Sequence, residues 1–268
     1  MDVQTLCDRL LSRFPASDAE DWDHVGLSVG RPRDEVGFVA VALDATAGNV
    51  RRAAEQGANV LITHHPVYLR APDAIVPPDK AYPASAGAAY EAVDRGVSII
   101  SLHTNLDRSL DARRMLPALT ELEATSSLEW PGEPDRLGYG AVAAAPEGPT
   151  LGAFAQRCAD AFGTEPRVWG DAGQPLHRIA FLGGSLGHMG DDVVRAGCDA
   201  VVTGEAGYHV CQDLLLRGVG VILLGHDRSE EPFVDILKAA VHAISPATRI
   251  ATIDGSRQWW TLTRGDRS

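Results

Sequence analysis

The sequence has few cysteines and no long apolar run. Its 268 residues include four cysteines at scattered positions, which form neither a CxxC pair nor a dense disulfide framework. This pattern argues against a disulfide scaffold or a thiolate zinc site, and it favours a reducing compartment, the cytoplasm. No stretch approaches the roughly 20 apolar residues that span a bilayer. We therefore expect a soluble protein that does not enter a membrane.

Positive charge is also scarce. The chain has 24 Lys and Arg residues against 36 Asp and Glu residues, and its formal net charge is −12. Such a surface repels polyphosphate backbones, which disfavours nonspecific nucleic-acid binding. The N-terminus lacks the basic and apolar regions of a signal peptide. The spacing of Val3, Leu6 and Leu10 predicts a structural helix there instead.

The chain does contain an internal repeat. Residues 36–46 and 178–187 each predict a strand that is followed by a helix, a strand, a helix and a third strand. The repeat aligns Thr63 with Thr203, an offset of 140 residues. Its later strands are continuous apolar runs, which are typical of buried parallel strands. The sequence therefore predicts an α/β fold of two similar lobes with mainly parallel sheets, spanning residues 1–124 and 125–268.

Polar side chains gather where the predicted strands end. Four of these ends read THHP, HTNLD, TGEAGYH and GHDRSE. In open parallel sheets, ligands bind beyond the carboxyl ends of the strands. Two lobes that face each other would bring these ends into one cleft between them. The residues concerned are His64, His65, His103, Asp107, Glu205, His209, His226 and Glu230.

These residue types suit a metal site. Imidazole and carboxylate groups bind borderline divalent ions such as Zn, Fe, Mn, Co or Ni. Three of these histidines and two of these carboxylates together already exceed what one catalytic ion usually takes, and they fit two ions that share a carboxylate. The spacing of His226 and Glu230 would place both on one side of a helix that begins at this point.

Other interpretations of single residues remain open. The two adjacent histidines of THHP could simply bond to the backbone, and the aspartate of HTNLD could cap a helix. We predict His103, Glu205 and His209 as catalytic candidates that line the pocket. His103 could instead be a buried histidine with satisfied hydrogen bonds, and Glu205 could instead stabilise the N-terminus of a helix.

Taken together, the motifs resemble the Nif-three-like dinuclear metal centre family, whose members are also called GTP cyclohydrolase 1 type 2 homologues. The matching stretches, in family order, are WDHVGLSVG (22–30), ALDAT (42–46), ITHHP (62–66), HTNLD (103–107), TGEAGYH (203–209) and GHDRSE (225–230). The resemblance implies two interlocked lobes and a homohexamer built as a trimer of dimers. It also implies two divalent transition-metal ions per chain, with the ligands His64, His65, Asp107, His226 and Glu230.

Two functions are compatible with this resemblance. The first is a two-metal hydrolase that acts on a nucleotide-like or phosphoester substrate. The family label names GTP, although the chain contains no recognised guanine-reading motif. The second is a non-enzymatic role, either as a metal-binding ring or as a protein-interaction adaptor. Substrate turnover that depends on the metal would separate the two.

Overall fold

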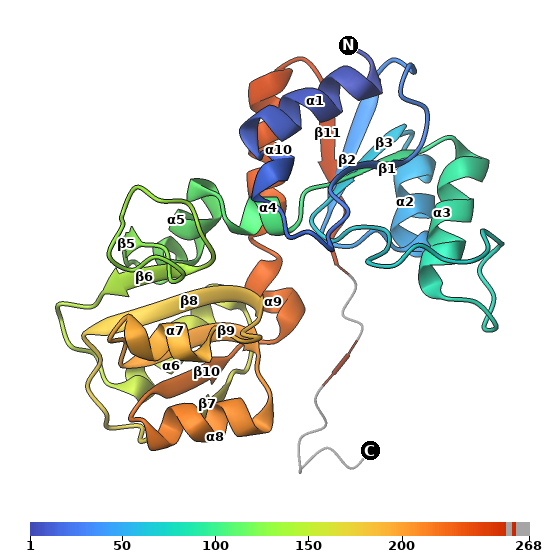
Figure 1. Ribbon diagram of the computed structural model, residues 1–268. Helices are drawn as coiled ribbons and strands as arrows, with labels where there is room; N and C mark the ends of the chain where they lie inside the picture. Colours follow the sequence, from blue (N-terminus) through green and yellow to red (C-terminus); the bar gives the residue numbers. More distant parts are fainter. Residues whose placement is uncertain (256–258, 261–268) are drawn as a thin grey trace.

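Two β-sheets form the framework of the molecule. The computed structural model describes residues 1–255, 259 and 260, and Figure 1 shows one sheet in each of two lobes. The strands of the first sheet are β1 (Gly26–Val29), β2 (Phe38–Ala42), β3 (Val60–Thr63), β4 (Ser98–Ser101) and β11 (Arg249–Thr252). Those of the second are β5 (Ala124–Ser126), β6 (Ala141–Ala144), β7 (Arg167–Trp169), β8 (Arg178–Ser185), β9 (Ala200–Glu205) and β10 (Gly220–Leu223).

The central strands of both sheets are parallel. The first sheet has the order β1-β4-β3-β2-β11, and only β1 runs antiparallel to its neighbour. The second has the order β5-β6-β8-β9-β10-β7, in which β8, β9 and β10 are parallel. Its flanking strands β5, β6 and β7 form antiparallel pairs. The predicted α/β fold with two sheets is confirmed. The first sheet is mainly parallel as predicted, whereas the second is mixed, because only its central strands β8, β9 and β10 are parallel.

The predicted repeat is visible in the strand register. Val39 lies opposite Val60 in the first sheet, and Ile179 lies opposite Ala200 in the second. These are the same two positions shifted by the predicted 140 residues, so the two lobes share the pairing of their first two parallel strands.

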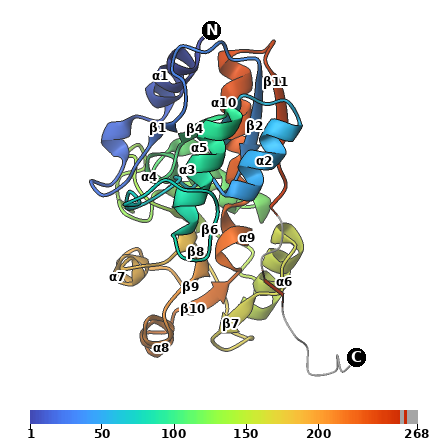
Figure 2. The same ribbon diagram turned by 90° about the vertical axis from the view of Figure 1, so that its right-hand side faces the viewer.

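Helices cover both faces of each sheet, because successive residues of a buried strand point to opposite faces. On β2, Val39 packs with α1 and α10, whereas Ala40 packs with α2 and α3. Figure 2 shows α7 and α8 on one side of the second sheet and α6 on the other. The helices are α1 (Val3–Arg13), the 3-10 helix η1 (Ala16–Asp18), α2 (Ala47–Glu55), α3 (Ala84–Arg95), α4 (Thr104–Asp107), α5 (Leu110–Leu119), α6 (Leu151–Phe162), α7 (Gly190–Arg195), α8 (Tyr208–Leu216), α9 (His226–Glu230) and α10 (Phe233–Ile244).

Local sequence signals set the ends of these helices. The predicted N-cap Thr46 accepts the backbone N–H of Asn49 at 3.1 Å, which begins α2. Gly57 and Gly197 follow α2 and α7 with φ values of 86° and 66°. This left-handed conformation favours glycine, and it turns the chain from each helix into the next parallel strand.

Two elements late in the chain lie outside the second lobe, although the predicted lobe of residues 125–268 includes them: helix α10 (Phe233–Ile244) and strand β11 (Arg249–Thr252). Strand β11 pairs in parallel with β2 of the first sheet, where Arg249 lies opposite Phe38. Helix α10 packs against α1, β2 and β3. The reason is that α10 has an apolar side, including Leu237 and Val241, that the inner face of the first sheet buries. The repeat carries no information about this return.

Candidate metal centre

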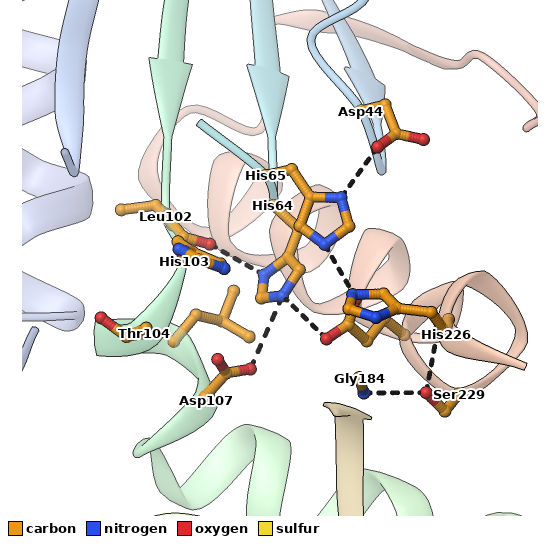
Figure 3. A network of polar contacts seen from close by, with 12 residues as sticks. Asp44, His64, His65, Leu102, His103, Thr104, Asp107, Gly184, His226 and Ser229 are labelled. Atoms are coloured by element: carbon orange, nitrogen blue, oxygen red, sulfur yellow. Dashed lines mark hydrogen bonds and ion pairs between the residues drawn. The ribbon is translucent and has the colours of Figure 1, made fainter. Parts of the chain in front are cut away.

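Segments that follow three parallel strands meet between the lobes. His64 and His65 follow β3, and Asp107 ends the short helix α4 after β4. His226 begins α9 just beyond β10, and Glu230 ends it. Figure 3 shows the labelled side chains of these segments turned toward one another. The structure therefore brings all five predicted metal ligands together.

Glu230 is the shared member of this cluster. Its Oε2 lies 2.8 Å from His65 Nε2 and 3.1 Å from His226 Nε2. Its Oε1 lies 3.7 Å from His64 Nε2, which is itself 3.6 Å from Asp107 Oδ1. The cluster thus consists of two triads that have one carboxylate in common, and each triad could hold one ion.

An oxygen acceptor orients each of the three imidazoles at Nδ1. The pairs are His64 Nδ1 with the carbonyl oxygen of Leu102 at 3.0 Å, His65 Nδ1 with Asp44 Oδ1 at 2.8 Å, and His226 Nδ1 with Glu205 Oε1 at 3.1 Å. A carbonyl or an ionised carboxylate can only accept, so Nδ1 carries the proton and donates it. In the neutral ring the lone pair is then on Nε2, which faces the centre in all three residues.

The surroundings of the His64 Nε2 atom show whether the site suits a metal ion. The side chain is fully buried, and Nε2 has no hydrogen-bond partner among the described residues. Leaving a buried polar atom unpaired destabilises a fold by about 1–3 kcal/mol. The two nearest carboxylate oxygens lie beyond hydrogen-bonding distance, at 3.6 and 3.7 Å. Imidazole and carboxylate donors that surround a shared space suit a borderline divalent ion, so the residues fit the implied metal.

Hydrogen bonding concentrates positive charge on two of the histidines. Burial disfavours a charged ring, but the carboxylates of Asp44 and Glu230 raise the pKa of His65 to about 10. Hydrogen bonding to Glu230 raises the pKa of His226 to about 9. Burial, with repulsion from Glu230, raises the pKa of Asp107 to about 7. A metal ion would compete with all of these protons.

His103 also faces the centre. Its ring centroid lies 5.3 Å from that of His64, and its Nδ1 donates to Asp23 Oδ1 at 2.9 Å. The Asp23 side chain is fully buried, and it also accepts the backbone N–H of Thr104 at 3.0 Å. The proximity of His103 to the ligands agrees with its predicted place in the pocket, and its catalytic role stays a prediction.

Glu205 and His209 have different positions. Glu205 does not cap a helix but accepts a hydrogen bond from His226, and so orients a predicted ligand. His209 lies exposed on α8, where its ring packs 5.3 Å from that of Tyr208. The structure does not bring His209 to the centre, because α8 directs its side chain to solvent.

Asp23 and Asp44 are site residues that the sequence did not reveal. Both lie in motifs that match the family, WDHVGLSVG and ALDAT. A signal existed for Asp44, which follows the end of β2 by two residues at the same sheet edge as the histidines. Asp23 has no such signal, because it lies in a loop outside the repeat.

Two glycines allow α9 to approach the second sheet. A Cβ atom on Gly204 would lie 2.5 Å from the carbonyl oxygen of Gly184 and 2.6 Å from Ser229 Oγ. A Cβ atom on Gly184 would collide with Oε1 of Glu230. Because neither glycine has a Cβ atom, Ser229 Oγ can accept the N–H of Gly184 at 2.9 Å, and this bond fixes α9 against the sheet. This contact places Glu230 within reach of the first lobe.

The fold and this cluster define a two-lobed α/β protein with a candidate metal centre between its lobes. The chain belongs to the Duf34/NIF3 (NGG1p interacting factor 3) family, whose model matches residues 1–257. The resemblance drawn from the motifs is confirmed.

Relatives and solved structures match almost the whole chain. A GTP cyclohydrolase 1 type 2 homolog of Clostridium acetobutylicum is 27% identical over 257 residues, which cover 93% of this chain and 94% of the relative. Another, of Streptomyces coelicolor, is 30% identical over 91% of this chain and 86% of its own. A hypothetical protein of Staphylococcus aureus superposes with a TM-score of 0.86 at 24% identity, covering 98% of this chain and 99% of that one. A Bacillus cereus protein related to NIF3 gives the same TM-score at 19% identity, with the same coverage of 98% and 99%. The solved structures confirm the fold.

The approach of α9 yields a prediction with a matched control. Gly184 and Gly187 have similar φ values, 60° and 54°, but of these two glycines only Gly184 would place a Cβ atom against Glu230. Gly184→Ala should therefore displace Glu230 and reduce bound metal, measured by elemental analysis, by at least about half. Gly187→Ala imposes a similar backbone strain and should leave metal content unchanged. Equal metal content in the two variants would contradict this account of the site.

The protonated histidines predict that metal binding releases protons. The pKa values of His65 and His226 are raised to about 10 and about 9, so at pH 7.5 both rings carry a second proton, on Nε2. Each ring must lose this proton to coordinate a metal through Nε2. Loading should release about two protons per chain from these rings at pH 7.5. Metal affinity should rise with pH up to about 9–10 and level off above it, as the rings lose their protons without metal. Calorimetric titration in buffers of different ionisation enthalpy measures the release, and a value near zero would refute the assignment.

Proposed function

We propose that the protein is a metal-dependent hydrolase that binds two divalent transition-metal ions per chain and acts on a nucleotide-like or phosphoester substrate. The observation that carries this proposal is the fully buried Nε2 of His64, which has no partner among the described residues and faces two carboxylates. The relatives named GTP cyclohydrolase 1 type 2 homolog support the hydrolase class and a nucleotide-like substrate.

Each side chain of the centre has a role in this proposal. His64 and Asp107 would hold one ion, His65 and His226 the other, and Glu230 both. When bound, the ions would activate water and stabilise negative charge that develops on the reacting group. The remaining histidine, His103, donates Nδ1–H to Asp23 and keeps Nε2 available to exchange a proton with the substrate.

The proposed compartment is the cytoplasm. All four cysteines are free and buried, which agrees with a reducing environment. In the part of the chain that the structure describes, no helix is both long and apolar enough to cross a membrane.

Histidine variants test the function. His65→Ala and His226→Ala each remove one Nε2 ligand, so each should lower the metal content from about two ions per chain to about one. In a screen of nucleotides and phosphoesters with metal-reconstituted protein, turnover should fall about a hundredfold or more. His177→Ala is the matched control, because that side chain is 69% exposed and lies outside the centre.

The same experiment addresses the non-enzymatic alternative. Metal content that depends on His65 and His226, without turnover of any compound, would favour a metal-binding ring over an enzyme. Full turnover by chelated, metal-free protein would remove the two-metal proposal altogether.

We further propose a homohexamer arranged as a trimer of dimers, which the family resemblance supports. Closed symmetric rings are common among soluble homo-oligomers. Sedimentation at micromolar concentration should then give about six times the chain mass of 28.5 kDa. A clean monomer under these conditions would contradict the assembly.

A further inference from the structure

A cavity of about 710 Å³ opens directly beside the candidate metal centre. His65 and His226 form the wall that it shares with the centre, and residues of α9, α10 and the segment after β11 form the other walls. Its volume lies within the roughly 300–1,000 Å³ of small-molecule sites. A molecule held in this cavity would have one end next to the metal ligands.

An indole ring forms one wall of the cavity. Trp259 packs over Gly225, where a Cβ atom would lie 3.1 Å from the ring. Its Nε1–H donates to Asp227 Oδ1 at 3.1 Å, which fixes the orientation of the ring. The residue remains 46% exposed and lines the cavity. The exposed part of an indole offers a surface on which flat rings stack and to which cations are attracted.

The cavity is strongly acidic. Its one lysine or arginine among the described residues is Arg228, which pairs with Glu231 at 2.9 Å. Asp235 and Asp254 have no ion pair with any residue in the described part of the chain. The six carboxylates that line the cavity are Asp44, Glu205, Asp227, Glu231, Asp235 and Asp254.

These features select a ligand by charge as well as by shape. Two of the carboxylates, Asp44 and Glu205, are engaged with the histidines of the centre, and Glu231 is neutralised by Arg228. The remaining acidic groups attract a cation and repel an anion. A triphosphate chain would find no unpaired basic side chain among the described residues of this cavity.

We infer that this cavity binds a flat aromatic group bearing a positive charge, stacked on Trp259, while the bond to be hydrolysed lies at the adjacent metal centre. The inference rests on the proposed function in taking the metal centre as the reacting site. Within the proposed class, it narrows the substrate to a phosphoester whose other part carries a flat, positively charged aromatic group, and it places the phosphates of GTP outside this cavity.

Two small probes test the charge preference without any need for turnover. Tryptamine and tryptophol share an indole ring and a two-carbon chain, and they differ in carrying a protonated amine or a neutral hydroxyl. Calorimetry or fluorescence titration of the zinc-supplemented full chain should show tryptamine binding at least about tenfold more tightly. Equal affinities, tighter binding of GTP than of tryptamine, or no binding of either indole would overturn the inference.

Variants locate the binding to this cavity. Trp259→Leu should weaken tryptamine binding about tenfold, and the double variant Asp235→Asn with Asp254→Asn should reduce the preference over tryptophol to about twofold. Trp260→Leu is the matched control, since Trp260 is 78% exposed and does not line the cavity. Tryptamine affinity that is unchanged by Trp259→Leu, or lowered equally by Trp260→Leu, would refute the site.

Because binding is measured directly, this result is independent of hydrolysis. Tryptamine selectivity that depends on Trp259, combined with a substrate screen without turnover, would remove the hydrolase proposal and leave the ligand class standing. Turnover without tryptamine selectivity would remove the proposed ligand class and leave the hydrolase proposal standing.

Discussion

The carboxylate of Glu230 is the group on which the geometry of the centre depends. It belongs to α9 at the end of the second sheet, yet its oxygens lie 2.8 Å from His65 Nε2 and 3.7 Å from His64 Nε2 of the first lobe. Its side chain is only 5% exposed. Burial of this charge would be strongly unfavourable without the imidazoles around it. The contact between the lobes therefore depends on the same Glu230–histidine interactions that assemble the centre.

The orientation of the imidazoles follows from a second layer of contacts. Asp44, Glu205 and the carbonyl of Leu102 each accept an Nδ1–H, so the ligating nitrogens are chosen before any ion binds. All three acceptors lie at strand ends or just beyond them: Glu205 ends β9, Leu102 follows β4 and Asp44 follows β2. The sheet edges thus provide both the candidate ligands and the groups that orient them.

Divergence between the two repeats explains why the described part of the chain contains one candidate centre instead of two. The offset of 140 residues aligns His64 with Gly204 and His65 with Glu205. The missing side chain at Gly204 leaves room for Ser229 of α9, and Glu205 orients a ligand where His65 provides one. The first repeat therefore supplies two histidines from its second strand, and the second repeat supplies the space and the helix that complete the centre.

Much of this arrangement was determined by the sequence alone. Apolar runs, the Thr46 cap and the glycines that follow α2 and α7 are local signals, because strand burial and helix ends depend on neighbouring residues. The motifs also contain the five candidate ligands that the family resemblance implies, and the structure brings these residues together. The carboxyl ends of parallel strands lie at one edge of a sheet, which favours such a meeting.

Only the tertiary structure decided the rest. The return of α10 and β11 to the first lobe, the shared position of Glu230, and the roles of Asp23 and Asp44 depend on contacts between residues far apart in the chain. The outward direction of His209 depends on how α8 lies on its sheet. These long-range contacts depend on which buried surfaces pack well against each other. The hydrophobic pattern of one segment does not specify the segment against which it packs.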